Sequence, residues 1–217
     1  EGQGPESTQI IFTGASSFLL SLDSTLGWQG FVTISGFKIT ANGVNAGGIS
    51  LHQCAYVVIE DMHILTTGSS IYNTAAGDPD STFQTHVRRV RFDNCAKTAG
   101  TFGLDVFPSG TAAEISHLRV EDCQFEANGV PLAVANPPTS GAMRWRGLVC
   151  QIVNCGFTAN NNIALYVAKN GSPSNLTIEG TAFENTTSTI HPHLFIDSPM
   201  RVVRITNSEI LNNDAFK

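Results

Sequence analysis

Apolar and polar residues alternate along seven segments of the chain, and the same alternation returns in each segment. The segments come into register on a residue that tolerates a turn or a left-handed backbone: Gly36, Asp61, Asn94, Asp122, Asn154, Gly180 and Asn207. The positions four and two residues before this register residue, and three residues after it, are apolar in every segment except at Lys97. Apolar residues at every second position predict a strand with one buried face, because on a helix they would spread over all sides.

A second, shorter alternating run lies between most of these segments, at residues 49–54, 103–108, 131–136, 164–170 and 193–197. Each unit of 25 to 33 residues therefore contains at least two strands. Stacking the units buries each apolar position against its counterpart in the next unit, which predicts an all-β, single-stranded parallel β-solenoid of about seven coils. A leucine-rich repeat would need a regular Leu-x-x-Leu-x-Leu pattern that the chain lacks. A β-sandwich would not keep the same positions in register over seven units.

The composition fits a single β-helix domain over residues 1–217, with 41% hydrophobic and 14% charged residues. A net charge of −6 argues against duplex nucleic acid as a partner, because such binding needs a basic surface. The chain contains no run of 18 apolar residues, so the sequence predicts no membrane span. The first residues lack the profile of a signal peptide and the repeat starts without a capping element, so we expect a segment of a longer chain.

Three of the five cysteines, Cys95, Cys123 and Cys155, follow the register residue directly and therefore align in one column. A metal or redox site is one interpretation of this column. We favour an interior ladder of small, soft side chains, because a metal would need a fourth donor. Unpaired buried thiols would indicate folding in a reducing compartment. We expect no metal and no cofactor.

The stretches GQGPESTQIIFTG (2–14) and VTISGFKITANG (32–43), with the repeated V-x-I-x-(D/N)-C-x-F motif, resemble the pectate-lyase-like superfamily. The resemblance covers nearly the whole chain and is closest to polysaccharide lyases and phage tailspike depolymerases. It implies a right-handed parallel β-helix. It implies no single activity, because that superfamily includes lyases, hydrolases, epimerases and non-catalytic fibres. The superfamily's calcium-binding cluster of aspartates is not evident here, so we do not expect calcium-dependent pectate cleavage.

Charged residues gather at the outward positions of the middle units. In the alignment Arg91 and Asp93 stack on Arg119 and Glu121, one rung away. A pair of carboxylates this close is typical of glycosidases, and arginine forks bind anionic sugars. A salt-bridge ladder on a solvated sheet is the structural alternative.

Two long connections, residues 73–86 and 136–147, are predicted to form arms beside this strip, and the second arm carries Trp145. Hydrolysis would use Asp93 with Glu121, or Asp105 with an aspartate of the first arm. β-Elimination on a uronic acid would use His117 or His86 as the base and Arg91 or Arg119 to hold the carboxylate. Trp145 would stack on the sugar. Tyr166 is predicted to point outward from one of the shorter runs. An exposed aromatic residue there is as typical of a sugar-stacking site as of a homotrimer interface.

The residues and the resemblance together lead us to expect a polysaccharide-binding and polysaccharide-degrading domain like that of a phage tailspike. We expect it on a virion tail or outside the cell, with neighbouring domains of a longer chain or two further copies as its protein partners. One alternative is a structural or adhesive fibre domain without catalysis. Another is a secreted bacterial polysaccharide lyase or epimerase.

Overall fold

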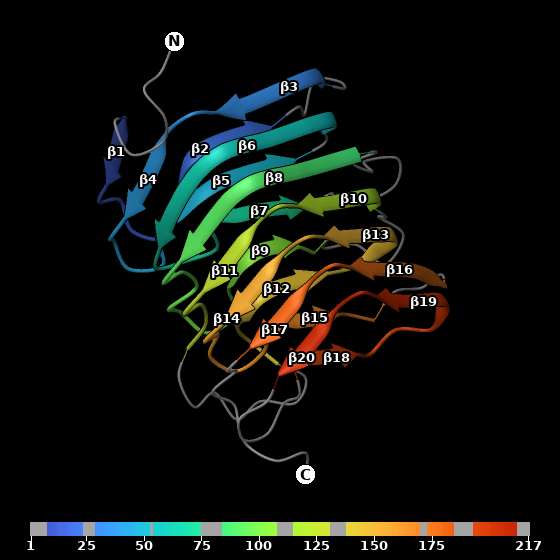
Figure 1. Ribbon diagram of the computed structural model, residues 1–217. Coiled ribbons are helices and arrows are strands. Elements are labelled where there is room, and N and C mark those ends of the chain that lie inside the picture. The colour runs from blue at the N-terminus through green and yellow to red at the C-terminus, as the bar shows by residue number, and fades with distance from the viewer. Residues whose placement is uncertain are drawn as a thin grey trace.

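In the computed structural model, two parallel β-sheets wind into a solenoid (Figure 1). The structure describes residues 8–23, 29–52, 54–74, 84–107, 115–130, 138–169, 173–184 and 193–211. Every regular element within these ranges is a strand. The described residues accordingly include no helix long and apolar enough to cross a membrane.

Each complete turn presents three faces. The first face stacks β3 (Gln29–Ser35), β6 (Cys54–Thr66), β8 (Gln84–Asp93), β10 (Ile115–Glu121), β13 (Gly147–Val153), β16 (Ser174–Glu179) and β19 (Met200–Thr206). The second face stacks β1 (Gln9–Phe12), β4 (Lys38–Ala41), β11 (Gln124–Glu126), β14 (Gly156–Thr158), β17 (Ala182–Glu184) and β20 (Glu209–Leu211), with the second halves of β6 and β8. The third face is the smaller sheet, of β2 (Phe18–Asp23), β5 (Gly47–His52), β7 (Ile71–Thr74), β9 (Phe102–Val106), β12 (Gly141–Trp145), β15 (Leu165–Val167) and β18 (Leu194–Ile196).

The solenoid makes about six turns, since six steps separate the seven strands of the first face. The steps run from 25 residues, between the paired Ile34 and Ile59, to 33 residues, between Val87 and Val120. In Figure 1 the first-face strands run leftward in front and the third-face strands rightward behind, while the chain descends. This sense is right-handed. The predicted all-β, right-handed parallel β-helix is confirmed.

A left-handed residue turns the chain from the first face to the second, and it corrects the predicted register in one coil. Positive φ occurs at all seven predicted register residues, and in six of them it marks this turn: Gly36, Asp61, Asp122, Asn154, Gly180 and Asn207. In β8 the equivalent residue is Arg89, at φ 51°, because β8 pairs with β10 through Val87 and Val120. Asn94 was predicted at this place, so the alignment was wrong by five residues.

The corrected register closes the gap that Lys97 left in the apolar column. Phe92 takes that place, and four phenylalanine rings stack inside the solenoid. Centroid spacings are 4.5 Å from Phe92 to Phe125, 4.5 Å from Phe125 to Phe157 and 4.8 Å from Phe157 to Phe183. All four rings are buried, so the ladder is the largest aromatic contribution to the core.

The same correction separates the predicted cysteine column. Cys123 and Cys155 remain rung neighbours, each one residue before the paired Gln124 and Gly156. Cys95 instead aligns with Asn128, whose side-chain oxygen accepts a hydrogen bond from the Cys95 amide at 2.9 Å. Asn128 and Asn160 are buried and continue this ladder by bonding to each other and to backbone carbonyls. The turn is therefore held by asparagine, and Cys95 lies at the end of its ladder.

The predicted second arm is largely a strand of the third face. Residues 141–145 form β12, and Trp145 pairs in register with Val106 and Val167, pointing into the core with 0% of its surface exposed. The run predicted as the strand of this coil, 131–136, lies outside the described residues. The prediction of an exposed Trp145 is therefore wrong, because the alternating run GAMRW was taken for a loop. Of the first arm, residues 75–83 are not described.

Candidate functional site

Three columns of side chains point outward from the first face. The column nearest the strand starts contains Phe31, Tyr56, Gln84, His117, Val149, Asn175 and Val202. The middle column contains Thr33, Val58, His86, Arg119, Gln151, Thr177 and Arg204. The third contains Ser35, Glu60, Arg88, Glu121, Val153, Glu179 and Thr206. Strands about 4.8 Å apart bring the charged members of these columns into contact.

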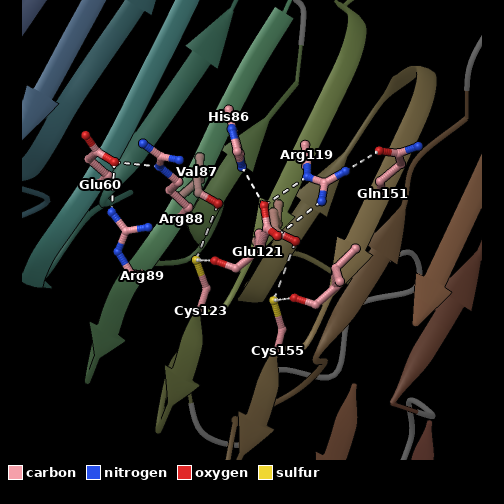
Figure 2. A network of polar contacts seen from close by, with 12 residues as sticks. Glu60, His86, Val87, Arg88, Arg89, Arg119, Glu121, Cys123, Gln151 and Cys155 are labelled. Atoms are coloured by element: carbon pink, nitrogen blue, oxygen red, sulfur yellow. Dashed lines mark hydrogen bonds and ion pairs between the residues drawn. The ribbon is translucent and has the colours of Figure 1, made fainter. Parts of the chain in front are cut away.

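Glu121 is the centre of one polar cluster on this face (Figure 2). Arg119 donates to its carboxylate through Nε at 3.0 Å and through Nη2 at 3.1 Å. His86 Nε2 lies 3.1 Å from the same carboxylate. Arg119 also donates to the Gln151 side-chain oxygen at 3.3 Å. These four residues, from three adjacent strands, form what we call the Glu121 cluster.

A second cluster adjoins it at the corner of the coil. Arg88 and Arg89 both contact the Glu60 carboxylate, and Arg89 also bonds to both oxygens of Asp61 at 2.7 and 2.9 Å. The hydrogen bond from Arg89 lowers the pKa of the Asp61 carboxyl. Arg88 stands between Glu60 and Glu121 in the third column, so like charges do not stack directly.

Protonation within the Glu121 cluster follows from its contacts. The hydrogen bond from Arg119 is the main cause that lowers the pKa of Glu121 below its usual value. Burial lowers the pKa of His86, although the neighbouring Glu121 carboxylate opposes this shift. At neutral pH the cluster therefore holds an ionised carboxylate, a guanidinium and an uncharged imidazole. Such a carboxylate suits the role of a base or of a hydrogen-bond acceptor better than that of a general acid.

Arg91 and Asp93 do not belong to the Glu121 cluster. They lie on the second face, where Asp93 pairs in register with Glu126 and Arg91 with Gln124. One Arg91 nitrogen contacts both Asp93, at 3.2 Å, and Glu126, at 2.9 Å, and His63 lies 3.4 Å from Asp93. The expected pair of Asp93 with Glu121 is therefore not formed. The reason is the five-residue slip, which placed Arg91 and Asp93 where His86 and Arg88 stand.

His117 lies on the first face, two residues before Arg119 on the same strand and on the same side. Its backbone pairs with Gln84 and Val149. The structure thus brings three predicted site residues, His117, Arg119 and Glu121, onto one strand. It adds Arg88, which sequence reasoning missed, and places in β8 His86, which was expected in the first arm as an alternative base. Two features of the sequence could have placed these residues correctly. Thr85 and Val87 alternate with polar residues, and Lys97 does not fit the apolar core column.

Asp105 and Tyr166 lie on the third face, in one outward column with Arg144 between them. Asp105 is only 1% exposed and accepts two bonds from Arg144 at 2.8 Å each. Burial raises the pKa of Asp105, and the Arg144 guanidinium acts against that rise. The Arg144 guanidinium also packs over the rings of Phe102 and Phe107, at 4.7 and 4.2 Å from their centroids.

Tyr166 is 6% exposed and packs against the rings of Phe102 and Phe195. A buried carboxylate with its own cation and a buried phenol offer little to a ligand. The expected partners of Asp105 in the first arm, Asp78 and Asp80, lie outside the described residues.

Within the described residues, no three His, Cys, Asp or Glu side chains are grouped so that they could hold a metal ion. The five cysteines form no disulfide and are buried. Burial raises the pKa of the Cys95, Cys123 and Cys150 thiols, which makes them poor nucleophiles. Comparison with protein-family models, curated proteins and solved structures gives no match to this chain.

Proposed function

We propose that this chain binds an extended polysaccharide along the first face of the solenoid. The observation that supports this most directly is the Glu121 cluster, where Arg119, His86 and Gln151 offer hydrogen-bonding groups on successive rungs of a partly exposed surface. A glycan presents hydroxyl or carboxylate groups at regular intervals. A solenoid face repeats its side chains about every 4.8 Å, which suits such a ligand.

The arginine of the cluster is held in place and still accessible. Glu121 fixes its guanidinium through two bonds, while the Arg119 side chain keeps 40% of its surface exposed. A preformed donor loses little conformational entropy when it binds a ligand, and a planar guanidinium matches a carboxylate. An anionic glycan is therefore the preferred class.

Cleavage is a second candidate function, and it belongs to the second face. Asp93 and Glu126 contact the same Arg91 nitrogen, so their oxygens are no farther apart than those two contacts combined. Retaining glycosidases use two carboxyl groups about 5–5.5 Å apart. Arg91 lies between the two groups, and substrate would have to displace it. Binding at the Glu121 cluster requires no such displacement, which is why we place binding first.

The setting of such a protein follows from the resemblance to tailspike depolymerases and polysaccharide lyases. It favours a bacterial surface glycan as the ligand and a virion tail or the extracellular space as the location. A fibre domain without catalysis and a secreted lyase or epimerase remain rivals. A fibre domain without catalysis would leave the glycan uncut. A lyase would release unsaturated ends.

Binding is tested by titrating the protein with a panel of polygalacturonate, alginate, hyaluronan, dextran and purified capsular and O-antigen polysaccharides. Arg119→Ala should weaken binding roughly 10- to 100-fold, the scale of a charge-assisted hydrogen bond. Arg91→Ala is the matched control: it removes an exposed arginine with carboxylate partners from another face, and should bind like the parent. If no polysaccharide binds the parent, or if both variants bind equally, the proposal is wrong.

Cleavage is followed in the same mixtures by new reducing ends, for hydrolysis, or by the ultraviolet absorbance of unsaturated uronates, for elimination. Asp93→Asn and Glu126→Gln should each abolish cleavage and leave binding unchanged. Release of ends at the parent rate by both variants would remove the second face from consideration.

A further inference from the structure

Two aromatic rings are exposed together on the first face, at its N-terminal end. Phe31 of β3 and Tyr56 of β6 are register partners, and their rings stack with centroids 4.8 Å apart and planes 16° apart. Phe31 is 87% exposed and Tyr56 is 39% exposed. The core ladder of Phe92 and its neighbours has the same stacking geometry but is buried. Because these two rings remain exposed to solvent, core packing does not explain why aromatic residues occupy these positions.

This aromatic pair is continuous with the polar surface described above. The first outward column runs from Phe31 and Tyr56 to Gln84 and His117 on the next two strands. Arg119 lies two residues beyond His117 on β10 and points to the same side. Two strand spacings, about 10 Å, therefore separate the strand of Tyr56 from β10, which carries Arg119 and Glu121.

We propose that Phe31 and Tyr56 form a stacking subsite for one pyranose ring of the bound glycan. A pyranose has an apolar face of C–H groups and a rim of hydroxyl groups. An open aromatic ring suits the apolar face, and Gln84, His86 and Thr33 border it with hydrogen-bonding groups. The glycan then runs along the solenoid axis, across the strands, from the aromatic pair to Arg119. This subsite rests on the proposed function and adds the direction of the chain to it.

A sugar fits this surface better than a second copy of the protein does. Fully burying two aromatic side chains removes about 150–250 Å² each, well below the roughly 800 Å² per partner of a stable protein interface. Of the neighbouring outward residues, Thr33, Ser35 and Gln84 are polar and Val58 is apolar, so a single valine extends the apolar patch beside the two rings. Small apolar patches with polar borders are typical of sugar-stacking sites.

The experiment titrates the tightest-binding polysaccharide of the panel into Phe31→Ala, Tyr56→Ala and Phe31→Trp variants. The two alanine variants should each weaken binding roughly 3- to 10-fold, the scale of one aromatic stacking contact. Phe31→Trp keeps a ring at the same place and should bind at least as well as the parent. Val44→Ala is the matched control, because Val44 is 77% exposed in the turn between β4 and β5 and lies outside the proposed path.

The outcomes separate this subsite from the proposed function. If Phe31→Ala and Tyr56→Ala bind like the parent while Arg119→Ala is weak, the subsite is wrong and the polar site stands. If Arg119→Ala also binds like the parent, or if the parent binds nothing, both proposals fail. Sedimentation of each variant tests whether a second copy of the protein occupies this surface instead. If the parent is an oligomer that Phe31→Ala dissociates, the rings form a subunit interface and the subsite is wrong.

Discussion

Two arginine–carboxylate pairs of nearly the same geometry lie on different faces of the solenoid. On the first face Arg119 bonds twice to Glu121, at 3.0 and 3.1 Å. On the third face Arg144 bonds twice to Asp105, at 2.8 Å each. Their surroundings differ: the Arg119 and Glu121 side chains are 40% and 27% exposed, and those of Arg144 and Asp105 are 16% and 2% exposed.

This difference assigns the two pairs to different roles. Water screens the exposed pair, so its bonds contribute little to stability and are easily exchanged for bonds to a ligand. Asp105 has almost no exposed surface at which water could replace a lost partner, and the rings of Phe102 and Phe107 pack against the Arg144 guanidinium. An ion pair that cannot exchange partners holds the structure together, and one that can is suited to binding. Variants of the two arginines test this comparison.

The largest effect is expected for Arg144→Met. The substitution keeps an apolar side chain beside the rings of Phe102 and Phe107 but leaves the Asp105 carboxylate buried without a cation. Removing one partner of a buried pair costs about 3–5 kcal/mol of unfolding free energy. Urea denaturation followed by circular dichroism measures this loss, and polysaccharide binding by the protein that remains folded should be unchanged.

The double variant Asp105→Asn/Arg144→Met is the control for that interpretation. It removes both charges, so it should recover part of the stability that Arg144→Met loses. A double variant that is less stable than Arg144→Met would contradict the view that an uncompensated carboxylate causes the loss.

The fold was predictable because its signal is repeated. Apolar residues at the same offsets in seven segments define the strands of the first face, and an error in one segment leaves the others intact. The slip in β8 arose because both Arg89 and Asn94 adopt a positive φ in the structure, while only asparagine suggests a turn by its type. Lys97 in an otherwise apolar column was the sign that this segment was misaligned.

The site was less predictable, because single contacts decide it. A shift of five residues moved Arg91 and Asp93 from the second face to the first, left His86 in the first arm and hid Arg88. In the third face, alternation alone did not distinguish the strand 141–145 from a loop, so Trp145 was expected at the surface. The partly exposed Arg119 and Glu121 were placed correctly, because their strand aligns on a turn residue, Asp122, that was assigned correctly.

An intermediate effect is expected from acid, and it concerns the exposed cluster. Burial lowers the pKa of His86 in the folded protein below its usual value near 6.5. As the pH falls through about 6.5, the unfolded chain binds a proton that the folded chain does not, so stability decreases until the folded pKa is passed. One such group contributes a slope of at most about 1.4 kcal/mol per pH unit.

His86→Gln removes this contribution, so the variant should lose less stability than the parent between pH 7.5 and pH 5. Burial also lowers the pKa of His193, but that histidine is present in both proteins and cancels in the difference. The measurement is the urea midpoint of both proteins across this pH range. Parallel curves would show that His86 is as accessible to protons in the folded protein as in the unfolded one.

The smallest effect on stability is expected for Arg119→Met, the counterpart of Arg144→Met on the first face. Glu121 keeps its contact with His86 and stays partly hydrated, so the loss should be about 0–1 kcal/mol.

Salt distinguishes the two pairs further, because about 1 M NaCl shortens the screening length to roughly 3 Å and acts on solvated charges first. The difference in unfolding free energy between the parent and Arg119→Met should therefore disappear at high salt, while the difference for Arg144→Met persists. An Arg119→Met loss that matches the Arg144→Met loss, or that survives high salt, would mean that the Glu121 cluster is a structural element. Its arginine would then not be available to a glycan.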